Sequence, residues 1–153
     1  VENRLSGIAY FEACLDSQSP LDLIILMLGT NDLKARFGVD PYTIAFGFGR
    51  YLNAVKTVPM AGNRPEVLLA APLLIDPSYK DVPLFLDMFG EGAVERSEKF
   101  AEAYEAFAKE NGVHFIDASK YGKASVRDGV HMEAEYHEKL GKAFAEKVKE
   151  ILG

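Results

Sequence analysis

The sequence predicts an α/β fold in which a mostly parallel sheet carries helices on both faces. Three short apolar runs, Leu21–Leu28, Val67–Ala71 and Val113–Ile116, have the near-continuous hydrophobicity of strands that are buried on both faces. Amphipathic segments alternate with these runs, and strands that alternate with helices form parallel sheets. The 153 residues, of which 48% are hydrophobic, suit one domain with a real core.

The helices predicted between these runs have recognisable ends. Asp40 and Pro41 begin one of them, because an acidic N-cap followed by proline at the first helical position is a typical helix start. Asn111 and Gly112 end another, directly before the third strand. The predicted elements are the helices Ile8–Asp16, Asp40 to about Val58, Glu91–Asn111 and Glu133–Leu152, a loop with a short helix over residues 72–90, and the end of a further strand at Val1–Asn3.

Charge and cysteine content narrow the classes of partner. The net charge is −6, with both signs interspersed, which argues against a nucleic acid partner because phosphate binding needs a basic patch. No uninterrupted apolar stretch reaches the roughly 18 residues of a membrane-spanning helix. The one cysteine, Cys14, has no partner for an internal disulfide and fits a small core position. Nothing in the sequence fixes a compartment, and the cytoplasm is the default expectation.

Polar residues follow the predicted strands where parallel sheets place their binding sites. Gly29-Thr-Asn31-Asp32 comes directly after the first apolar run, and Asp128-Gly-Val-His131 lies between the third run and the last helix. Ligands of open α/β sheets bind beyond the carboxyl ends of the strands. We therefore expect the two segments to meet at one edge of the sheet, although they are far apart in the sequence.

The residue types in these segments suit chemistry at a carbonyl group. An imidazole with an ordinary pKa of about 6.5 exchanges protons near neutrality, so His131 is the candidate general base. Asp128 can accept a hydrogen bond from its ring and hold one tautomer. Asn31 offers an amide donor to a developing oxyanion, and such a bond can be worth about 3–4 kcal/mol. Gly7 follows the predicted strand Val1–Asn3, which makes its backbone N–H a candidate second donor.

The same residues have plainer interpretations that stay open at this point. An Asp-x-x-His segment also describes a surface turn or a helix cap, and Asp32 can shape its loop instead of touching a substrate. Asp128, His131 and Asp32 could ligate a divalent ion, but no second histidine, cysteine cluster or calcium-binding loop accompanies them, so no metal is expected. His114 lies within an apolar run and is expected in the core, whereas His137 is expected in solvent.

Taken together, the two segments resemble blocks of the SGNH, or GDSL-type, esterase family. Gly29–Asp32 matches the third block, Gly-x-Asn-Asp, and Asp128–His131 matches the fifth, Asp-x-x-His. Leu5–Gly7 resembles the second block, whose glycine donates to the oxyanion. The longer stretch Pro20–Lys34 is similar to the arylesterase-like or acyltransferase-like branch, and the likeness covers nearly the whole chain.

The resemblance implies a flavodoxin-like, three-layer α/β/α fold and a single hydrolase domain over residues 1–153. It implies a Ser-His-Asp triad with His131 and Asp128, an oxyanion hole with Asn31 and Gly7, and no cofactor. It also implies hydrolysis of small-molecule esters with short acyl groups, acyl transfer to alcohols, and self-association into a homo-oligomer. From their loop positions, the residues expected to line an apolar substrate pocket are Leu73, Leu74, Ile75 and Val130.

The sequence departs from the family at the nucleophile. The first block, Gly-Asp-Ser, is absent, because no serine follows Gly-Asp at the end of an apolar run; the serines are Ser6, Ser17, Ser19, Ser78, Ser97, Ser119 and Ser125. We therefore expect a domain without its first strand and helix, with an uncovered sheet edge and the nucleophile on an N-terminal segment outside this sequence. A loop between Gly7 and Ile8 is also expected to be missing. Two alternatives remain: a non-catalytic fold remnant that binds a ligand or partner chain, and one half of a split esterase.

Overall fold

Three parallel strands form the centre of the structure, a computed structural model that describes residues 6–153. The strands β1 (Leu23–Leu26), β2 (Glu66–Ala71) and β3 (His114–Asp117) lie in the order β1-β2-β3. The predicted strand end Val1–Asn3 lies outside the described residues. The helices are α1 (Gly7–Gln18), α2 (Pro41–Thr57), α3 (Pro83–Phe89), α4 (Ala93–Ser97), α5 (Phe100–Asn111) and α6 (Ala134–Leu152).

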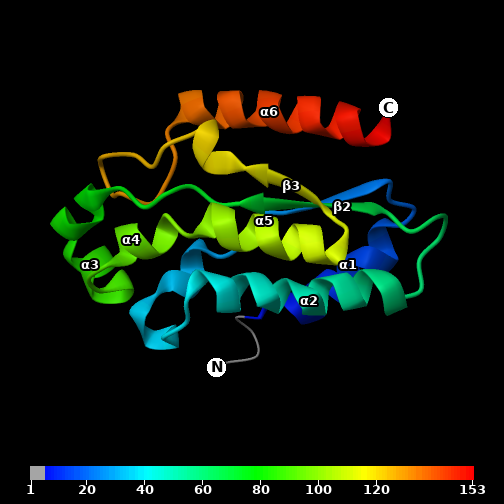
Figure 1. Ribbon diagram of the computed structural model, residues 1–153, viewed down its shortest axis with the longest axis horizontal. Helices are drawn as coiled ribbons and strands as arrows, with labels where there is room; N and C mark the ends of the chain where they lie inside the picture. The colour runs from blue at the N-terminus through cyan, green and yellow to red at the C-terminus, as the bar shows by residue number, and fades with distance from the viewer. Residues whose placement is uncertain (1–5) are drawn as a thin grey trace.

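Helices cover both faces of the sheet, which confirms the predicted three-layer α/β/α sandwich. Helix α6 lies on one face, and α2 and α5 lie on the other with α1 beside α2 (Figure 1). Side chains alternate accordingly along β2, as expected for a strand. Leu68 packs toward α6, where it joins Phe144. Leu69 packs into the larger cluster, which contains Phe48 of α2 and Tyr104 of α5.

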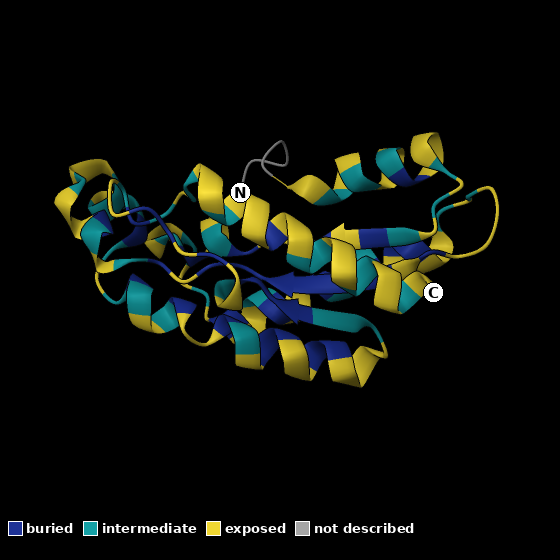
Figure 2. Ribbon diagram, turned by 90° about the horizontal axis from the view of Figure 1, so that it is seen from above, coloured by how far each residue is buried: buried dark blue, intermediate teal, exposed yellow. Residues whose placement is uncertain are grey.

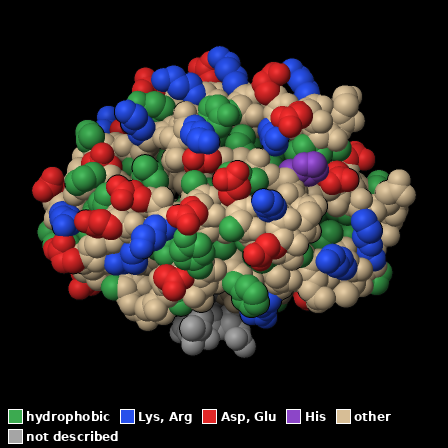
Figure 3. All heavy atoms as spheres, viewed as in Figure 1, with side chains coloured by type: hydrophobic (Ala, Val, Ile, Leu, Met, Phe, Trp, Pro, Cys, Tyr) green, Lys and Arg blue, Asp and Glu red, His purple; other side chains and the backbone are tan. Residues whose placement is uncertain are grey.

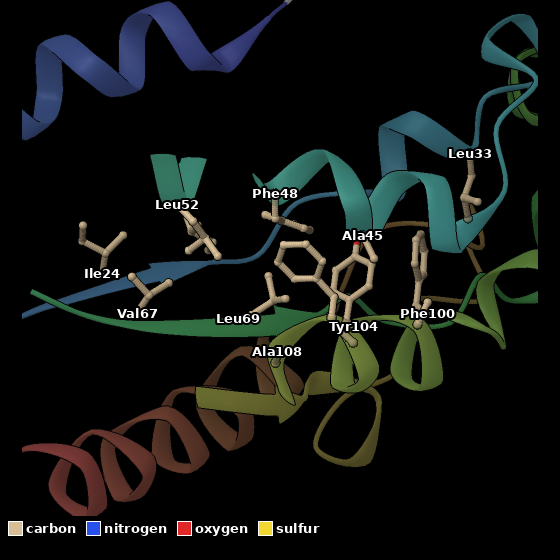
Figure 4. Packing of buried hydrophobic residues seen from close by; sticks show 14 of the residues in the cluster. Ile24, Leu33, Ala45, Phe48, Leu52, Val67, Leu69, Phe100, Tyr104 and Ala108 are labelled. Atoms are coloured by element: carbon tan, nitrogen blue, oxygen red, sulfur yellow. The ribbon is translucent and has the colours of Figure 1, made fainter. Parts of the chain in front are cut away.

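Aromatic rings fill the space between the sheet and the helices α2 and α5. The centroids of the Phe48 and Tyr104 rings are 5.2 Å apart and those of Phe100 and Tyr104 are 5.3 Å apart, both in edge-to-face geometry. Figure 4 shows Phe48 and Tyr104 meeting above Leu69. The sheet is largely buried, whereas the outer sides of the helices are exposed (Figure 2). The aromatic residues of α5 therefore belong to the core.

The predicted start of α2 and the predicted end of α5 are both confirmed by local hydrogen bonds. Asp40 caps α2, because its Oδ1 accepts a hydrogen bond of 2.8 Å from the backbone N–H of Thr43. Gly112 follows the last residue of α5, and its N–H donates back to the carbonyl of Ala108. The loop over residues 72–90 contains α3, so the short helix predicted there is also present.

The single helix predicted over Glu91–Asn111 is wrong, because the structure has two helices there. Helix α4 ends at Ser97 and α5 begins at Phe100. Ser97 is fully buried, and its hydroxyl donates to the carbonyl of Val94 at 2.7 Å while accepting from the N–H of Ile75 at 3.0 Å. A serine hydroxyl that bonds to nearby backbone competes with helical hydrogen bonds. The break between α4 and α5 therefore occurs where Ser97 contacts the loop that follows β2.

Replacing Ser97 with alanine is expected to destabilise the protein by about 1–3 kcal/mol, because the buried N–H of Ile75 loses its acceptor. The free energy of unfolding, from urea denaturation, is the measurement. Ser17→Ala is the control: Ser17 is exposed and its hydroxyl reaches only the carbonyl of Cys14, at 3.5 Å, so its substitution should change stability by no more than about 0.5 kcal/mol. Equal losses in the two variants would contradict this role of Ser97.

The first strand is shorter than the apolar run that predicts it, and its side chains are less buried than expected. Strand β1 covers Leu23–Leu26 within the predicted Leu21–Leu28. Among residues 6–153, β1 pairs only with β2. Ile25, Met27 and Leu28 are 40%, 39% and 45% exposed. The expectation of burial on both faces is therefore wrong for β1, whose outer edge is open within the described residues. The predicted lack of a first strand and helix stays a prediction.

Of the two histidines outside the Asp128–His131 segment, His137 is as exposed as the sequence predicts, whereas His114 is less buried than predicted. His114 was expected in the core, but its side chain is 38% exposed and its Nε2 lies 3.1 Å from Glu66 Oε2. The reason is its position at the start of β3, where the sheet meets solvent. His137 is exposed on α6, as predicted.

Charges of both signs are interspersed over the face drawn in Figure 3. This pattern agrees with the sequence-based argument against a basic patch for phosphates. Within residues 6–153, no helix combines the length and the apolar character that crossing a membrane requires.

Candidate active site

The loop between β3 and α6 folds Asp128 and His131 onto one another. Asp128 Oδ2 lies 2.8 Å from His131 Nδ1, and Oδ1 accepts backbone hydrogen bonds of 2.9 Å from Val130 and from His131. A tight turn supports this pairing, because the N–H of Gly129 donates to the carbonyl of Ser125 at 2.7 Å. Both carboxylate oxygens of Asp128 are therefore engaged within one turn.

The electrostatics of this pair favour an ionised Asp128. Partial burial raises the pKa of its carboxyl, but the backbone N–H groups of His131 and Val130 and the His131 ring lower it by more, so the net pKa lies below its ordinary value. An ionised carboxylate only accepts hydrogen bonds, so Nδ1 of His131 carries the proton. This tautomer leaves Nε2 of the ring as a proton acceptor. The side chain of His131 is 72% exposed and accessible to a substrate.

The loop that follows β2 holds the Asp128–His131 turn in place. The N–H of Asp76 donates to the carbonyl of Gly129 at 2.9 Å. Gly129 has a φ of 71°, and a Cβ there would lie 2.3 Å from the backbone nitrogen of Tyr79 and 2.5 Å from the carbonyl oxygen of Asp76. Only glycine fits this close approach. The rings of His131 and Phe85, which belongs to α3, have centroids 5.9 Å apart.

Asn31 lies in a 3₁₀ turn, Thr30–Leu33, at the carboxyl end of β1. Gly29 begins this turn with a φ of 127°, and a Cβ there would lie 2.1 Å from the hydroxyl of Tyr104. That hydroxyl donates to the carbonyl of Leu28 at 2.8 Å. Tyr104 thus fixes the point where the chain leaves the strand. The side chain of Asn31 is exposed, and within residues 6–153 its amide makes no hydrogen bond to another residue.

Gly7 begins α1 beside the Asn31 turn. Its neighbours Ser6 and Ile8 line a cavity of about 250 Å³, together with Gly29 and Asp32. As the first residue of a helix, Gly7 has an N–H without an acceptor inside that helix, at the end where the helix dipole is positive. The structure therefore brings the N–H of Gly7 and the Asn31 turn to the same cavity.

Asp32 points toward this cavity and is partly desolvated. Burial raises the pKa of its carboxyl, and its own backbone N–H and the charge of Lys34 lower it by less, so the net pKa lies above the ordinary value. The carboxyl is also close enough to raise the pKa of Tyr51, after the larger effect of burial on that hydroxyl. Asp32 thus lines the cavity, and the N-caps of the two short helices around it are Gly29 and Lys34.

All the loops that carry these residues lie at the carboxyl end of the sheet, as predicted (Figure 1). The structure joins Asp128 to His131 directly and places Gly7 near the Asn31 turn. No hydrogen bond links Asn31 to Asp128 or His131 in the described part of the chain. Nor do Asp128 and His131 line the cavity beside Gly7. The site therefore consists of two halves.

Two of the four residues expected to line an apolar pocket are buried in the core instead. Leu73 and Ile75 are buried in separate core clusters, because they point inward from the loop after β2. Leu74 is 42% exposed, and Val130 is partly buried against the main cluster. Of the predicted pocket residues, only Leu74 and Val130 can meet a substrate.

Six of the seven serine hydroxyls in the described residues donate to other partners, and the exception, Ser6, precedes α1 and lines the cavity beside Gly7. Ser125 is buried, and its hydroxyl donates to Glu133 Oε1 at 2.6 Å. Its backbone N–H donates to the carbonyl of His131, and its hydroxyl also accepts a hydrogen bond from the N–H of Arg127 at 3.1 Å. The other serines that donate to a nearby acceptor are Ser17, Ser19, Ser78, Ser97 and Ser119. Within residues 6–153, no serine hydroxyl is hydrogen-bonded to His131.

Two site residues escaped the sequence analysis. Tyr104 lies in the segment predicted only as the helix Glu91–Asn111, and Phe85 lies in the loop with a short helix predicted over residues 72–90. Tyr104 acts on a carbonyl that is 76 positions away, so no local pattern could reveal the contact. As for a metal, the described residues contain no group of three or more His, Cys, Asp or Glu side chains arranged to hold one.

Comparison with known proteins places these motifs in a family context. The model of the GDSL-like lipase/acylhydrolase family matches residues 3–139. None of the curated proteins matches the sequence.

Several solved structures are similar over nearly the whole chain. A carbohydrate acetylesterase from Sinorhizobium meliloti is 39% identical with a TM-score of 0.88, and the match covers 97% of this chain and 69% of that one. The aryl esterase of M. smegmatis is 36% identical with a TM-score of 0.89, at the same coverage of 97% and 69%. A second carbohydrate acetylesterase family member from Sinorhizobium meliloti is 29% identical with a TM-score of 0.89, covering 97% and 70%.

Proposed function

The chain belongs to the GDSL-like lipase/acylhydrolase family, and we propose that it hydrolyses carboxylic esters of small molecules through a Ser-His-Asp triad. The observation that carries this proposal is the pair formed by His131 and Asp128. The 2.8 Å contact between Nδ1 and Oδ2 fixes the ring, and the exposed Nε2 can reach a bound substrate. A histidine oriented by a carboxylate is the general base that ester hydrolysis needs at neutral pH.

In the proposed reaction, a serine hydroxyl attacks the ester carbonyl while His131 Nε2 takes its proton. The tetrahedral intermediate then collapses, and the imidazolium gives the proton to the leaving alcohol. Water attacks the resulting acyl-serine, with His131 again acting as base, and releases the carboxylic acid. Asp128 stays ionised throughout and stabilises the imidazolium. An alcohol that replaces water in the second step gives acyl transfer instead of hydrolysis.

The amide of Asn31 and the backbone N–H of Gly7 stabilise the oxyanion in this proposal. Two features support the assignment: chain neighbours of both residues, Ile8 and Asp32, line one cavity, and neither donor is hydrogen-bonded to another group within the described residues. Donors that are already in place stabilise a developing negative charge without reorganisation. The cavity does not include His131. The serine must therefore lie where its hydroxyl reaches His131 and where the oxyanion formed on the substrate reaches Asn31 and Gly7.

We place the nucleophilic serine on a segment outside residues 6–153 that pairs with the outer edge of β1. The exposed side chains of Ile25, Met27 and Leu28 support this placement, since an apolar strand edge favours pairing with another strand. A parallel strand added there would end beside Gly29, next to the half of the site that holds Asn31. The same edge would serve a separate partner chain, as in a split esterase.

The substrate class follows from the relatives and the exposed residues. The similar structures include an aryl esterase and carbohydrate acetylesterases, so we propose acetyl and other short acyl esters. Leu74 and Val130 offer the apolar contacts on the described side of the site. Self-association into a homo-oligomer stays a prediction.

The test is to treat the protein, isolated as its own cells make it, with a fluorophosphonate and to assay aryl acetate hydrolysis. One covalent adduct on a serine outside residues 6–153, with loss of hydrolysis, is the expected result. An adduct on any serine within residues 6–153, Ser6 included, would overturn the placement of the nucleophile but not the esterase. Absence of both adduct and hydrolysis, with aryl acetates and acetylated sugars alike, would overturn the proposed function.

A further inference from the structure

Arg96 binds backbone carbonyls from two segments that are distant in sequence. From α4, its Nη2 donates to the carbonyl of Leu33 at 3.2 Å and to that of Phe89 at 2.7 Å, and its Nη1 donates to the carbonyl of Glu91 at 2.8 Å. The last carbonyls of a helix or turn have no partner within it, so the guanidinium satisfies groups that would otherwise need water. The planar fork of arginine suits several acceptors at once.

Both segments lead directly to the proposed site. Leu33 ends the turn that carries Asn31. Phe89 ends α3, and Phe85 of the same helix lies against the ring of His131. Phe85 and Phe89 also pack on each other, with centroids 6.3 Å apart. Arg96 is thus a link between the half of the site that holds Asn31 and the half that holds His131.

We infer that Arg96 is a positioning residue that sets the location of the Asn31 amide relative to the His131 imidazole. The inference rests on the proposed function, because it concerns the alignment of an oxyanion donor with a general base. These groups share no direct hydrogen bond within residues 6–153, so their alignment depends on the segments that carry them. A displacement of about 1 Å in such a site can lower the rate about 100-fold.

The chain offers a matched control in Arg64. Its Nη1 donates to the carbonyls of Val55 and Val58 at 2.8 and 2.7 Å, so it also binds the carbonyls at the end of a helix. Arg64 precedes β2 and therefore lies at the opposite end of the sheet from the site. Arg96→Met and Arg64→Met remove the same type of interaction, and only the first is expected to affect catalysis.

The experiment measures kcat and KM for an aryl acetate at a temperature where each variant is folded. Arg96→Met is expected to lower kcat by about 10- to 100-fold with little change in KM. Arg96→Lys should restore part of the rate, because one ammonium group replaces some of the bonds. Arg64→Met should change kcat by less than about twofold. Equal effects of the two Met variants on kcat would overturn the inference.

A double-mutant cycle separates positioning from general stability. Asn31→Ala is expected to lower kcat by about 10²- to 10³-fold. If Arg96 acts through Asn31, adding Arg96→Met to Asn31→Ala should lower kcat little further, because the donor that it positions is already gone. Effects that multiply in the double variant would overturn the inference while leaving the esterase intact. If the unaltered protein hydrolyses no ester, the proposed function fails and the inference fails with it.

Discussion

Replacing His131 with alanine is expected to lower kcat/KM for an aryl acetate by about 10⁶-fold, and Asp128→Asn by about 10⁴-fold. Without the imidazole, nothing accepts the serine proton as the oxyanion forms. With asparagine at position 128, the side-chain amide can donate a hydrogen bond to Nδ1 of His131. This bond favours the tautomer whose proton is on Nε2. In that tautomer Nε2 cannot accept the serine proton. The contact of 2.8 Å between Nδ1 and Oδ2 makes the two residues one functional unit. Steady-state kinetics of the purified variants measure both effects.

His137→Ala is the matched control for this prediction. His137 is exposed on α6, away from the turn that holds Asp128, so its loss should change kcat/KM by less than about twofold. The losses expected for His131→Ala and Asp128→Asn also should not add, because each disables the same base. Activity in His131→Ala that matches activity in His137→Ala would remove His131 from the mechanism.

The pH dependence of the rate offers an independent check on this pair. Partial burial raises the pKa of the Asp128 carboxyl, but the hydrogen bonds that it accepts from His131 and Val130 lower the pKa by more. The net pKa therefore lies below the ordinary value of an aspartate. A carboxyl with a lowered pKa keeps its charge until the pH falls through that lowered value. Protonation of Asp128 should therefore add no step to the pH profile of kcat/KM until the pH falls below the ordinary range of an aspartate, and steady-state kinetics across acidic pH measure this.

Much of the fold could be predicted because local signals decide it. Asp40 before Pro41 determines where α2 begins, and Gly112 determines where α5 ends, whatever the rest of the chain does. The parallel arrangement of the strands follows from apolar runs that alternate with helices. The pairing of Asp128 with His131 is local too, since a turn of four residues brings the two side chains together.

The features that escaped prediction depend on contacts between distant segments. The break after Ser97 accompanies a hydrogen bond to Ile75, which no helical pattern around Ser97 contains. An apolar loop such as Leu73–Ile75 does not reveal which of its side chains face inward, and two of the four predicted pocket residues, Leu73 and Ile75, lie in the core. The partial exposure of Ile25 in β1 likewise depends on which strands lie beside it, and an apolar run looks the same beside one neighbour or two.

Gly129 shows how a distant contact can determine a residue within the motif itself. Replacing it with alanine is expected to destabilise the protein by about 4 kcal/mol or more, which lowers Tm by about 10 °C or more. A Cβ would overlap the backbone of Tyr79 and of Asp76, and neither can move as a flexible side chain could. The φ of 71° adds strain for any residue other than glycine.

Thermal unfolding of Gly129→Ala and Gly141→Ala makes the comparison. Gly141 lies inside α6, and no atom lies within 4 Å of the position that a Cβ would take, so alanine there should stabilise the protein by about 0.5–1 kcal/mol. The two substitutions add the same methyl group and should change Tm in opposite directions. A Tm for Gly129→Ala within about 2 °C of the unaltered protein would mean that the turn can shift away from Tyr79. The hydrogen bond from the N–H of Asp76 to the carbonyl of Gly129 would then not be enough to fix the position of the Asp128–His131 turn.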